Sequence, residues 1–438
     1  MLRRTLLGGL PALMLSAALL PHTAMAQTAA PSVDAPVTIS FYNYNLASAG
    51  LGGEATRKLI AEFMEANPNI IVEGVAVGSQ DMASRLQADM AANRIPDVAQ
   101  VVFDSLAFVA DNLGAVALED AIPADELAAH FEGMIPAGLN LGRLDDKTYA
   151  LAYTFSTPVL FYNADLFVEA GLDPDNPPRN WQEVRDAAAA IAETTGAGGF
   201  NGSLAGGGAA GFDWALQGVL LSNGGGVLSD DRATLTFDDP ATIEAVQMLR
   251  DLHEAGIYEN MPSEVMIEQM NSGRMGMLLT TSAQQNTLIR AAEGQYDLRV
   301  AAMPGFGDRA AVPTNSGSGL VILSEDPVKQ RAAFELMKFL TSERGYTIIT
   351  SEIGYLPLRP SIVDDPAYLA DWVEANPLVR PNLAQLERMQ PWAAYPGQSY
   401  RQIARIFLDA VELAVFGGAD VEQTLTAAQS QAQSLMPR

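Results

Sequence analysis

The feature that most constrains the fold is an alternation of short apolar strands with amphipathic helices near the start of the chain. The spacing of apolar residues predicts strand, helix, strand, helix and strand at residues 37–42, 54–65, 70–77, 82–92 and 98–103. Strands that alternate with helices favour a sheet of parallel strands covered by helices on both faces. We therefore expect an α/β protein.

The rest of the chain contains further strands and helices with clear end signals. Residues 227–237 predict a small hairpin that turns at a pair of aspartates. Asp239 and Asp326 each precede a proline and predict the starts of helices over 240–255 and 327–340. Two more helices are expected at the end of the chain. No internal repeat and no long disordered tract is apparent.

Residues 1–26 have the pattern of an export leader. A basic start is followed by an apolar stretch too short to span a bilayer comfortably, and Ala24 and Ala26 flank a cleavage position. Arg3 and Arg4 also permit twin-arginine export as the alternative to the general route. We therefore expect a signal peptide that is cleaved after Ala26.

The chain contains no cysteine, which bounds both its chemistry and its compartment. This excludes disulfides, thiol catalysis, cysteine zinc sites and a lipid-modified cysteine. Residues 27–36 form a short linker rich in alanine and proline, and no second apolar segment of spanning length follows. We expect a protein of the Gram-negative periplasm, without membrane insertion and long enough for two domains.

Acidic residues outnumber basic residues by 52 to 26, a net charge of −26. The leader carries two basic and no acidic residues, so the charge without it is −28. Such a surface repels nucleic acid and anionic lipid, and solubility explains it more simply than an acidic interaction surface. An anionic ligand would need a local cluster of arginines.

Patterns for catalysis are weak. His130 and His253 lie in no metal-binding spacing, and no serine lies in a GxSxG elbow. Residues 206–211 match GxGxxG, but the glycine-rich stretch before them predicts a loop instead of the strand that a nucleotide site needs. The aspartate pairs at 145–146 and 230–231 predict turns. We expect no enzyme, no metal and no cofactor.

The most distinctive run is residues 153–181, YTFSTPVLFYNADLFVEAGLDPDNPPRNW. Its apolar part, 159–162, predicts a buried strand. Asn163 or Asp165 can start a short helix, which Gly171 can end in a left-handed conformation.

The end of this run predicts a second helix start. Asn180 is followed three residues later by Glu183, as in a capping box, and Trp181 is expected in the core. The whole run resembles family 1 of the extracellular solute-binding proteins of ABC importers. It is most similar to the periplasmic glycerol-3-phosphate-binding branch, which has a very similar STPVL-aromatic-YN run followed by a GLDP-PP-W run.

The resemblance implies a two-lobe periplasmic binding protein (Venus-flytrap) fold with three interlobe crossings. The crossings are expected near residues 153–156, near 315–319 and shortly after Tyr355. Each lobe is then discontinuous, the N-terminal lobe comprising 37–155 plus 318–360 and the C-terminal lobe 156–317 plus 361–438. A monomer that delivers its ligand to the importer's membrane subunits is implied.

The residues themselves suggest five ligand contacts. Tyr42 and Asn43 follow the first strand, and Phe103 and Asp104 end the third, where open α/β sheets bind ligands. Packing at the rim and helix capping are the alternative roles for these four. Trp214 follows a glycine loop and is a candidate for stacking on a ligand.

The resemblance adds further contacts. The matching positions are Ser156, Thr281 (with Ser282 as a weaker candidate), Gly317, Tyr355 and Arg405. Arg401 lies one helical turn before Arg405.

Three positions depart from the branch pattern. The expected tyrosine falls at Ser79 or Gln80, the expected glutamate at Phe103 or Asp104, and a paired-tryptophan segment is reduced to residues 212–214.

The ligand class follows from the same resemblance. Glycerol-3-phosphate or a glycerophosphodiester is the first expectation, with Arg405 as its charged partner. A neutral oligosaccharide or polyol is the second. An exported carbohydrate enzyme and a sensory binding protein that docks on a receptor are the alternative classes.

Overall fold

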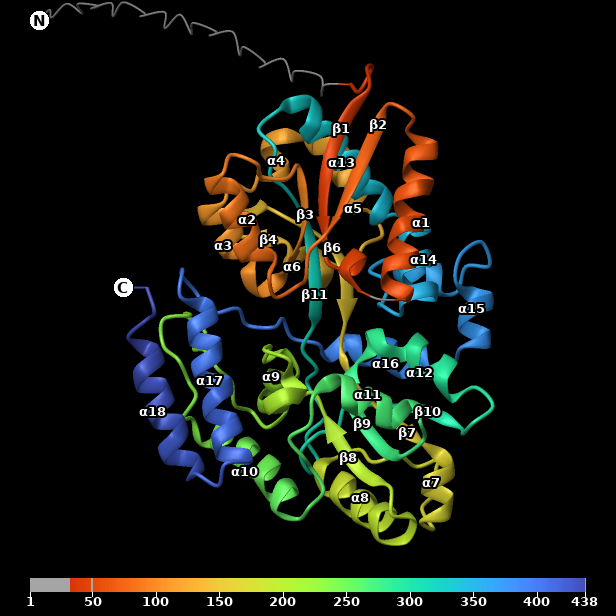
Figure 1. Cartoon of the computed structure of the whole chain (residues 1–438), viewed down its shortest axis with the longest axis vertical. Helices are drawn as coiled ribbons and strands as arrows, with labels where there is room; N and C mark the ends of the chain where they lie inside the picture. The colour runs from red at the N-terminus through yellow and green to blue at the C-terminus, as the bar shows by residue number, and fades with distance from the viewer. Residues whose placement is uncertain (1–31, 49, 438) are drawn as a thin grey trace, which may run out of the picture.

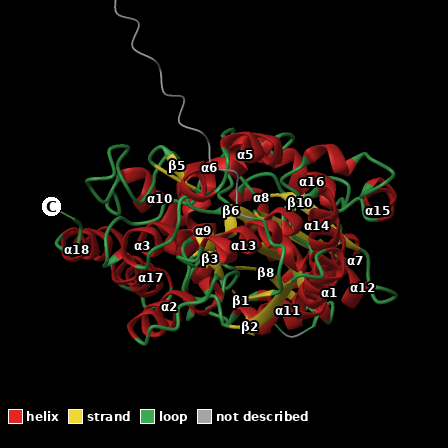
Figure 2. Ribbon diagram, turned by 90° about the horizontal axis from the view of Figure 1, so that it is seen from above, coloured by secondary structure: helices red, strands yellow, loops and turns green. Residues whose placement is uncertain are grey.

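The computed structural model describes residues 32–48 and 50–437, so the predicted leader lies outside the described residues. Two sheets, each flanked by helices, form two lobes that lie one above the other in Figure 1. Seen from above, helices surround the strands on both sides (Figure 2). Within this part of the chain, none of the helices is long and apolar enough to cross a membrane.

The sheet of the first lobe has five strands in the order β2-β1-β3-β11-β6. β1 (Val37–Asn43) pairs in parallel with β2 (Ile70–Ala76) and β3 (Val98–Val102). β11 (Ser316–Ile322) runs antiparallel to β3 and to β6 (Leu151–Ser156). The predicted parallel strands are confirmed.

Helices cover both faces of this sheet because its side chains alternate between two cores. Phe41 of β1 belongs to a core formed with α1 (Leu51–Ala66) and α13 (Pro327–Leu340). Tyr42, the next residue, belongs to a core on the opposite face with α2 (Met82–Ala91).

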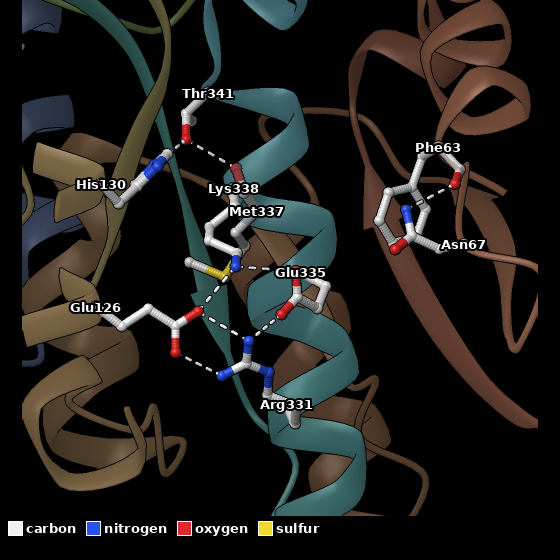
Figure 3. Close-up of polar contacts among 9 residues, drawn as sticks. All are labelled: Phe63, Asn67, Glu126, His130, Arg331, Glu335, Met337, Lys338 and Thr341. Carbon is white, nitrogen blue, oxygen red and sulfur yellow. Dashed lines mark hydrogen bonds and ion pairs between the residues drawn. The ribbon is translucent and has the colours of Figure 1, made fainter. Parts of the chain in front are cut away.

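An ion-pair cluster fastens α13 to α5 (Ala124–Phe131), as Figure 3 shows. Glu126 accepts hydrogen bonds from Arg331 at 2.6 and 2.8 Å and from Lys338 at 2.8 Å. The nearby His130 ring lies 2.8 Å from the hydroxyl of Thr341.

The sheet of the second lobe has four strands in the order β10-β7-β9-β8. β7 (Pro158–Asn163) lies antiparallel to β9 (Met275–Thr281) and to β10 (Leu298–Ala302), while β8 (Gly198–Gly202) is parallel to β9. α17 (Tyr400–Val415) and α18 (Val421–Gln433) contribute to the main core of this lobe.

The chain passes between the sheets at identifiable points. β6 ends at Ser156 and β7 begins at Pro158, so the first passage is at Thr157. The chain returns to the first sheet between β10 and β11. After residue 360, Ile362 and Leu369 still pack in a core of the first lobe. The number of crossings and the exact lobe boundaries stay predictions.

Several helix starts are formed as predicted. The side chain of Asn163 accepts hydrogen bonds from the backbone at the start of α7 (Ala164–Glu169). Asn180 does the same for α8 (Trp181–Thr195), with a bond of 3.0 Å from the nitrogen of Glu183.

Two local predictions are wrong, and a third is confirmed in reduced form. Residues 198–202 form β8 instead of a loop. The strand lies close to α8: a Cβ on Gly199 would lie 2.2 Å from the carbonyl oxygen of Ala188, so this close approach requires glycine. The predicted hairpin at 227–237 is formed in reduced length, with one antiparallel bridge between Leu228 and Leu235 and a turn over the two aspartates. Asp239 precedes α10 (Pro240–Glu254), but its side chain makes no capping bond.

Candidate functional site

A cavity of about 320 Å³ lies where the two lobes meet. The first lobe contributes Gln80, from the loop before α2, and Asp104, which follows β3. The second lobe contributes the glycine-rich loop before α9 (Trp214–Ser222) and residues of α17. Because ligands bind at the carboxyl ends of strands in open α/β sheets, this cavity is the candidate site.

Asp104 brings a buried carboxylate oxygen to the cavity. It lies in the tight turn Phe103–Ser105 at the end of β3. Its Oδ1 is buried and has no hydrogen-bond partner among the described residues. Burial raises the pKa of Asp104 to about 7; the positive charge of Arg401 opposes this shift, and the negative charge of Asp213 adds to it.

Arg401, in the first turn of α17, faces the cavity from the second lobe. Its Nε donates to the Tyr400 hydroxyl at 2.9 Å, and Nη1 donates to the backbone oxygen of Gln80 in the first lobe. Nη2 is buried without a hydrogen-bond partner in the described part of the chain. A cationic donor and an anionic acceptor, on opposite lobes, are therefore left for a bound molecule.

Arg405 also lines the cavity, but its environment differs from that of Arg401. Its side chain is 83% exposed, and its Nε lies 3.7 Å from Asp409. Asp409 and Glu412 line the cavity as well, so three carboxylates including Asp104 face two arginines.

Three residues predicted from the resemblance meet where the chain crosses between lobes. The Thr281 hydroxyl donates to the Ser156 hydroxyl oxygen at 2.8 Å. Ser156 of β6 pairs with Ser316 of β11, and the next pair along these strands is Phe155 with Gly317. The φ of Gly317 is +132°, and the backbone of β6 approaches it closely. Neighbouring Ser282 is buried, and its hydroxyl oxygen accepts from the nitrogen of Thr157 at 3.3 Å.

A buried ring of hydrogen bonds, missed from the sequence, lies beside these residues. The Tyr44 hydroxyl is 2.7 Å from Thr154, Thr154 is 2.6 Å from Ser318, and Ser318 accepts from Gln100 at 2.9 Å. The Gln100 side chain closes the ring by accepting from the nitrogen of Tyr44 at 3.2 Å. Tyr355 lies beside Tyr44; burial, followed by this neighbour, raises the pKa of Tyr355.

Three residues predicted as ligand contacts at the strand ends do not line the cavity. Each makes a contact within the first lobe. The Tyr42 hydroxyl donates to Asp89 at 2.9 Å. The Asn43 side chain accepts from the nitrogen of Leu46 at 2.9 Å. Phe103 packs in a core of the first lobe. A role for these three in ligand contact stays a prediction.

The aromatic residue at the cavity is Phe212, not Trp214. Trp214 is 8% exposed and packs in the core of the second lobe. Both rings belong to the segment 212–214. Periodicity around an irregular turn does not tell which of the two rings faces inward.

The groups at the cavity suit binding of a polar molecule. In the described residues, no three His, Asp or Glu side chains gather closely enough to hold a metal ion. The cavity offers hydrogen-bond donors and acceptors of both charges beside one aromatic ring. Such a mixture of an apolar wall and a few convergent polar groups is typical of small-molecule sites.

Comparison with known families matches residues 58–381 to the family described as bacterial extracellular solute-binding protein. A curated relative is the sn-glycerol-3-phosphate-binding periplasmic protein UgpB of Pectobacterium atrosepticum, 26% identical over 219 residues, or 47% of each chain. The corresponding protein of Escherichia coli K12 is 27% identical over 236 residues, 50% of this chain and 52% of the relative. The chain thus spans about half the length of these relatives.

The fold also matches solved structures over nearly all of the chain. UgpB from Mycobacterium tuberculosis, in complex with glycerophosphocholine, has a TM-score of 0.80 and 25% identity, covering 91% of this chain and 98% of the other. The cyclic alpha-maltosyl-1,6-maltose binding protein from Arthrobacter globiformis has a TM-score of 0.76 and 24% identity, covering 91% and 99%.

Proposed function

The chain belongs to the family of bacterial extracellular solute-binding proteins, and we propose that it captures a small polar solute between its lobes in the periplasm. In this proposal the protein acts as a monomer and delivers the solute to the membrane subunits of an ABC importer. Capture proceeds by closure of the two lobes on the ligand. The solute leaves the protein chemically unchanged.

One observation carries the proposal. Asp104 and Arg401 approach the same cavity from different lobes, and each has a buried atom without a partner in the described chain. Leaving a buried charged group unpaired is costly, so a ligand that bridges the two groups stabilises the closed arrangement. A hydroxyl can donate to Asp104, and an oxygen of the same ligand can accept from Arg401.

A glycerophosphodiester is the ligand class that we favour. The names of the curated relatives and the glycerophosphocholine complex support a glycerol phosphate compound. The charges at the cavity support a diester over a monoester, because three carboxylates disfavour a second negative charge on the ligand. Arg401 is the partner that we assign to the phosphate.

A neutral oligosaccharide is the second candidate. Phe212 lines the cavity and offers a face on which a sugar ring can stack. The structural match to a maltosyl-maltose-binding protein is consistent with this class through the fold alone.

Calorimetry tests both candidates together. Purified protein is titrated with glycerophosphocholine, glycerol-3-phosphate and maltose, and we expect one-to-one binding that is tightest for the diester. At a hundredfold excess over its Kd, the ligand should add about 2.7 kcal/mol to the free energy of unfolding. Ligand recovered after long incubation should be intact. Conversion beyond the amount of protein present would support an enzyme and contradict the proposal.

A further inference from the structure

Asp213 is a buried carboxylate directly behind the cavity, and nothing in the proposed function uses it. The residue is 1% exposed. Its carboxylate accepts from the Trp392 indole nitrogen at 2.8 Å, from the Tyr395 hydroxyl at 2.8 Å and from the Gln217 side chain at 3.0 Å. Burial raises the pKa of Asp213, and the hydrogen bonds from these three partners oppose that rise. Indole and amide N–H groups are donors only, so this set of partners fits an ionised carboxylate. No cation is among its hydrogen-bond partners in the described chain.

These bonds tie together two parts of the second lobe that each adjoin residues lining the cavity. The Gln217 side chain of α9 also donates to the backbone oxygen of Ala393 at 3.1 Å and accepts from its nitrogen at 3.0 Å. The orientation of its amide is therefore fixed. Residues 392–395 precede α17, the helix that carries Arg401.

The same carboxylate fixes the aromatic wall of the cavity. The Trp392 ring packs edge-on against Phe212, with ring centroids 6.0 Å apart and an interplanar angle of 85°. Because the Trp392 nitrogen is held by Asp213, the ring that supports Phe212 has a single orientation.

Asp213 also acts electrostatically on Asp104, the carboxylate on the first-lobe side of the cavity. The pKa of Asp104 is raised to about 7, mainly by burial, with a smaller contribution from the charge of Asp213. Arg401 opposes both effects. The phenol of Tyr400 is also close to Asp104, and Arg405, Asp409 and Glu412 line the same cavity. Two carboxylates that share one low-dielectric region disfavour simultaneous ionisation.

We propose that Asp213 is a positioning residue of the binding site, which fixes Phe212 and the approach to α17 through its three hydrogen bonds and acts by its charge on Asp104 across the cavity. The inference rests on the proposed function, because its readout is ligand affinity. Asp213 itself does not touch the ligand. It fixes the geometry of one wall, and its charge adds to the burial that raises the pKa of Asp104.

The decisive variant is Asp213→Asn, compared with the wild-type protein in titrations from pH 5.5 to 8.5. The probe is whichever of glycerophosphocholine, glycerol-3-phosphate and maltose the wild-type protein binds most tightly. Wild-type affinity should change with pH around 7, where Asp104 titrates. Loss of the Asp213 charge should move the midpoint of this change to lower pH by about half a unit or more. An unmoved midpoint would overturn the electrostatic part of the proposal.

The variant Trp392→Phe separates the effect of ring position on affinity from the effect of the Asp213 charge. It keeps a ring beside Phe212 and keeps the Asp213 charge, but removes the N–H that holds the ring. We expect affinity about five- to tenfold weaker at every pH, with the midpoint unchanged. Tyr395→Phe should weaken binding in the same sense. If both variants bind as tightly as the wild type, the positioning role is refuted, whether or not Asp213→Asn folds.

The matched control is Asp186→Asn, which removes the same charge from an exposed position on α8. Asp186 accepts only a surface bond from Gln182 at 2.9 Å in the same helix. Neither affinity nor midpoint should change. If the wild-type protein binds none of the three probes, the proposed function is contradicted. If the wild-type protein binds a probe and the Asp213 variants bind it in the same way, only the role of Asp213 is contradicted.

Discussion

Arg401 and Arg405 are one helical turn apart on α17, yet they differ in how much a ligand should depend on them. The resemblance singled out Arg405. The structure leaves Nη2 of Arg401 buried and unpartnered among the described residues, whereas the side chain of Arg405 is 83% exposed. A surface ion pair at 3.7 Å contributes little. We therefore expect Arg401 to be the main charged contact.

The prediction at this scale compares Arg401→Ala with Arg405→Ala by calorimetry with glycerophosphocholine. Arg401→Ala should cost on the order of 2–5 kcal/mol of binding free energy, because truncation leaves the buried anion without its partner. Arg405→Ala should cost about 1 kcal/mol or less. An equal loss in both variants, or a larger loss for Arg405→Ala, would contradict the assignment.

For single residues, the sequence predicted where along the chain the cavity residues lie better than it predicted which way their side chains point. It placed Asp104 at the end of β3 and Arg401 near the cleft, and the structure brings both to one cavity. It did not find Tyr44, because the chain turns directly after β1 and the alternation of side chains no longer applies there. Trp214 packs in the core of the second lobe and Phe212 lines the cavity, while contact of Trp214 with a ligand stays a prediction.

In the first-lobe sheet, the pairing of β11 with β6 depends on Gly317. Its φ of +132° is rarely adopted by other residues, and a Cβ would lie 2.0 Å from the carbonyl oxygen of Thr154 in β6. The strands therefore pair closely only with glycine here. This explains the glycine by packing, independently of any role in ligand contact.

Gly317→Ala should accordingly destabilise the fold by at least about 2–4 kcal/mol in urea unfolding, because strain and overlap with the backbone add. The matched control is Gly307→Ala. Gly307 has a φ of +55° and open space around its Cα, so only about 1 kcal/mol is expected. Similar losses in the two variants would show that β6 and β11 are not in the close contact described.

Between α5 and α13, His130 makes stability depend on pH. Burial is the main reason that its pKa falls to about 4, and the charges of Arg359 and Lys338 add to the shift. Thr341 donates to the Met337 oxygen at 2.7 Å, so the His130 ring, drawn in Figure 3, must donate to Thr341. The neutral ring is the form that the fold stabilises.

The sign of the effect follows from the two pKa values. In the unfolded chain His130 titrates near 6.5, so between about pH 6.5 and 4 the unfolded state binds more protons. The stabilisation that comes from the neutral His130 is complete above pH 6.5 and is lost as the pH falls to 4, by at most roughly 3–4 kcal/mol. In His130→Gln, the midpoint of urea unfolding should depend less on pH over this range than in the wild type. In the control variant His253→Gln, its dependence on pH should stay as in the wild type. An unchanged slope in His130→Gln would contradict the account.

At the scale of elements, predictions succeeded where local rules dominate. Asn180 starts α8 and Asp326 starts α13 because their side chains bond the first backbone nitrogens, which is a local property. β8 was missed because its glycines carry no strand signal. Its pairing with β9, which is distant in sequence, and its contact with the preceding helix α8 decide the conformation.

At the scale of the whole molecule, the lobes touch across the cleft. The Gln80 side chain donates to the backbone oxygen of Ala210 in the second lobe. Gln398 donates to Asn112 at 2.9 Å, and the Phe108 and Tyr400 rings lie 5.8 Å apart. These contacts join residues separated by more than a hundred positions, so periodicity could not reveal them. The two-lobe fold itself was anticipated from the run at 153–181 and is confirmed.

The most direct measurement of the central claim is a crystal structure of the protein with its tightest-binding ligand from the calorimetric panel. Closure on a bridging ligand predicts that the molecule lies in the cavity between the lobes, with one oxygen bonded to Nη2 of Arg401 and one group bonded to Oδ1 of Asp104. Ligand bound to one lobe alone, or outside this cavity, would contradict the account.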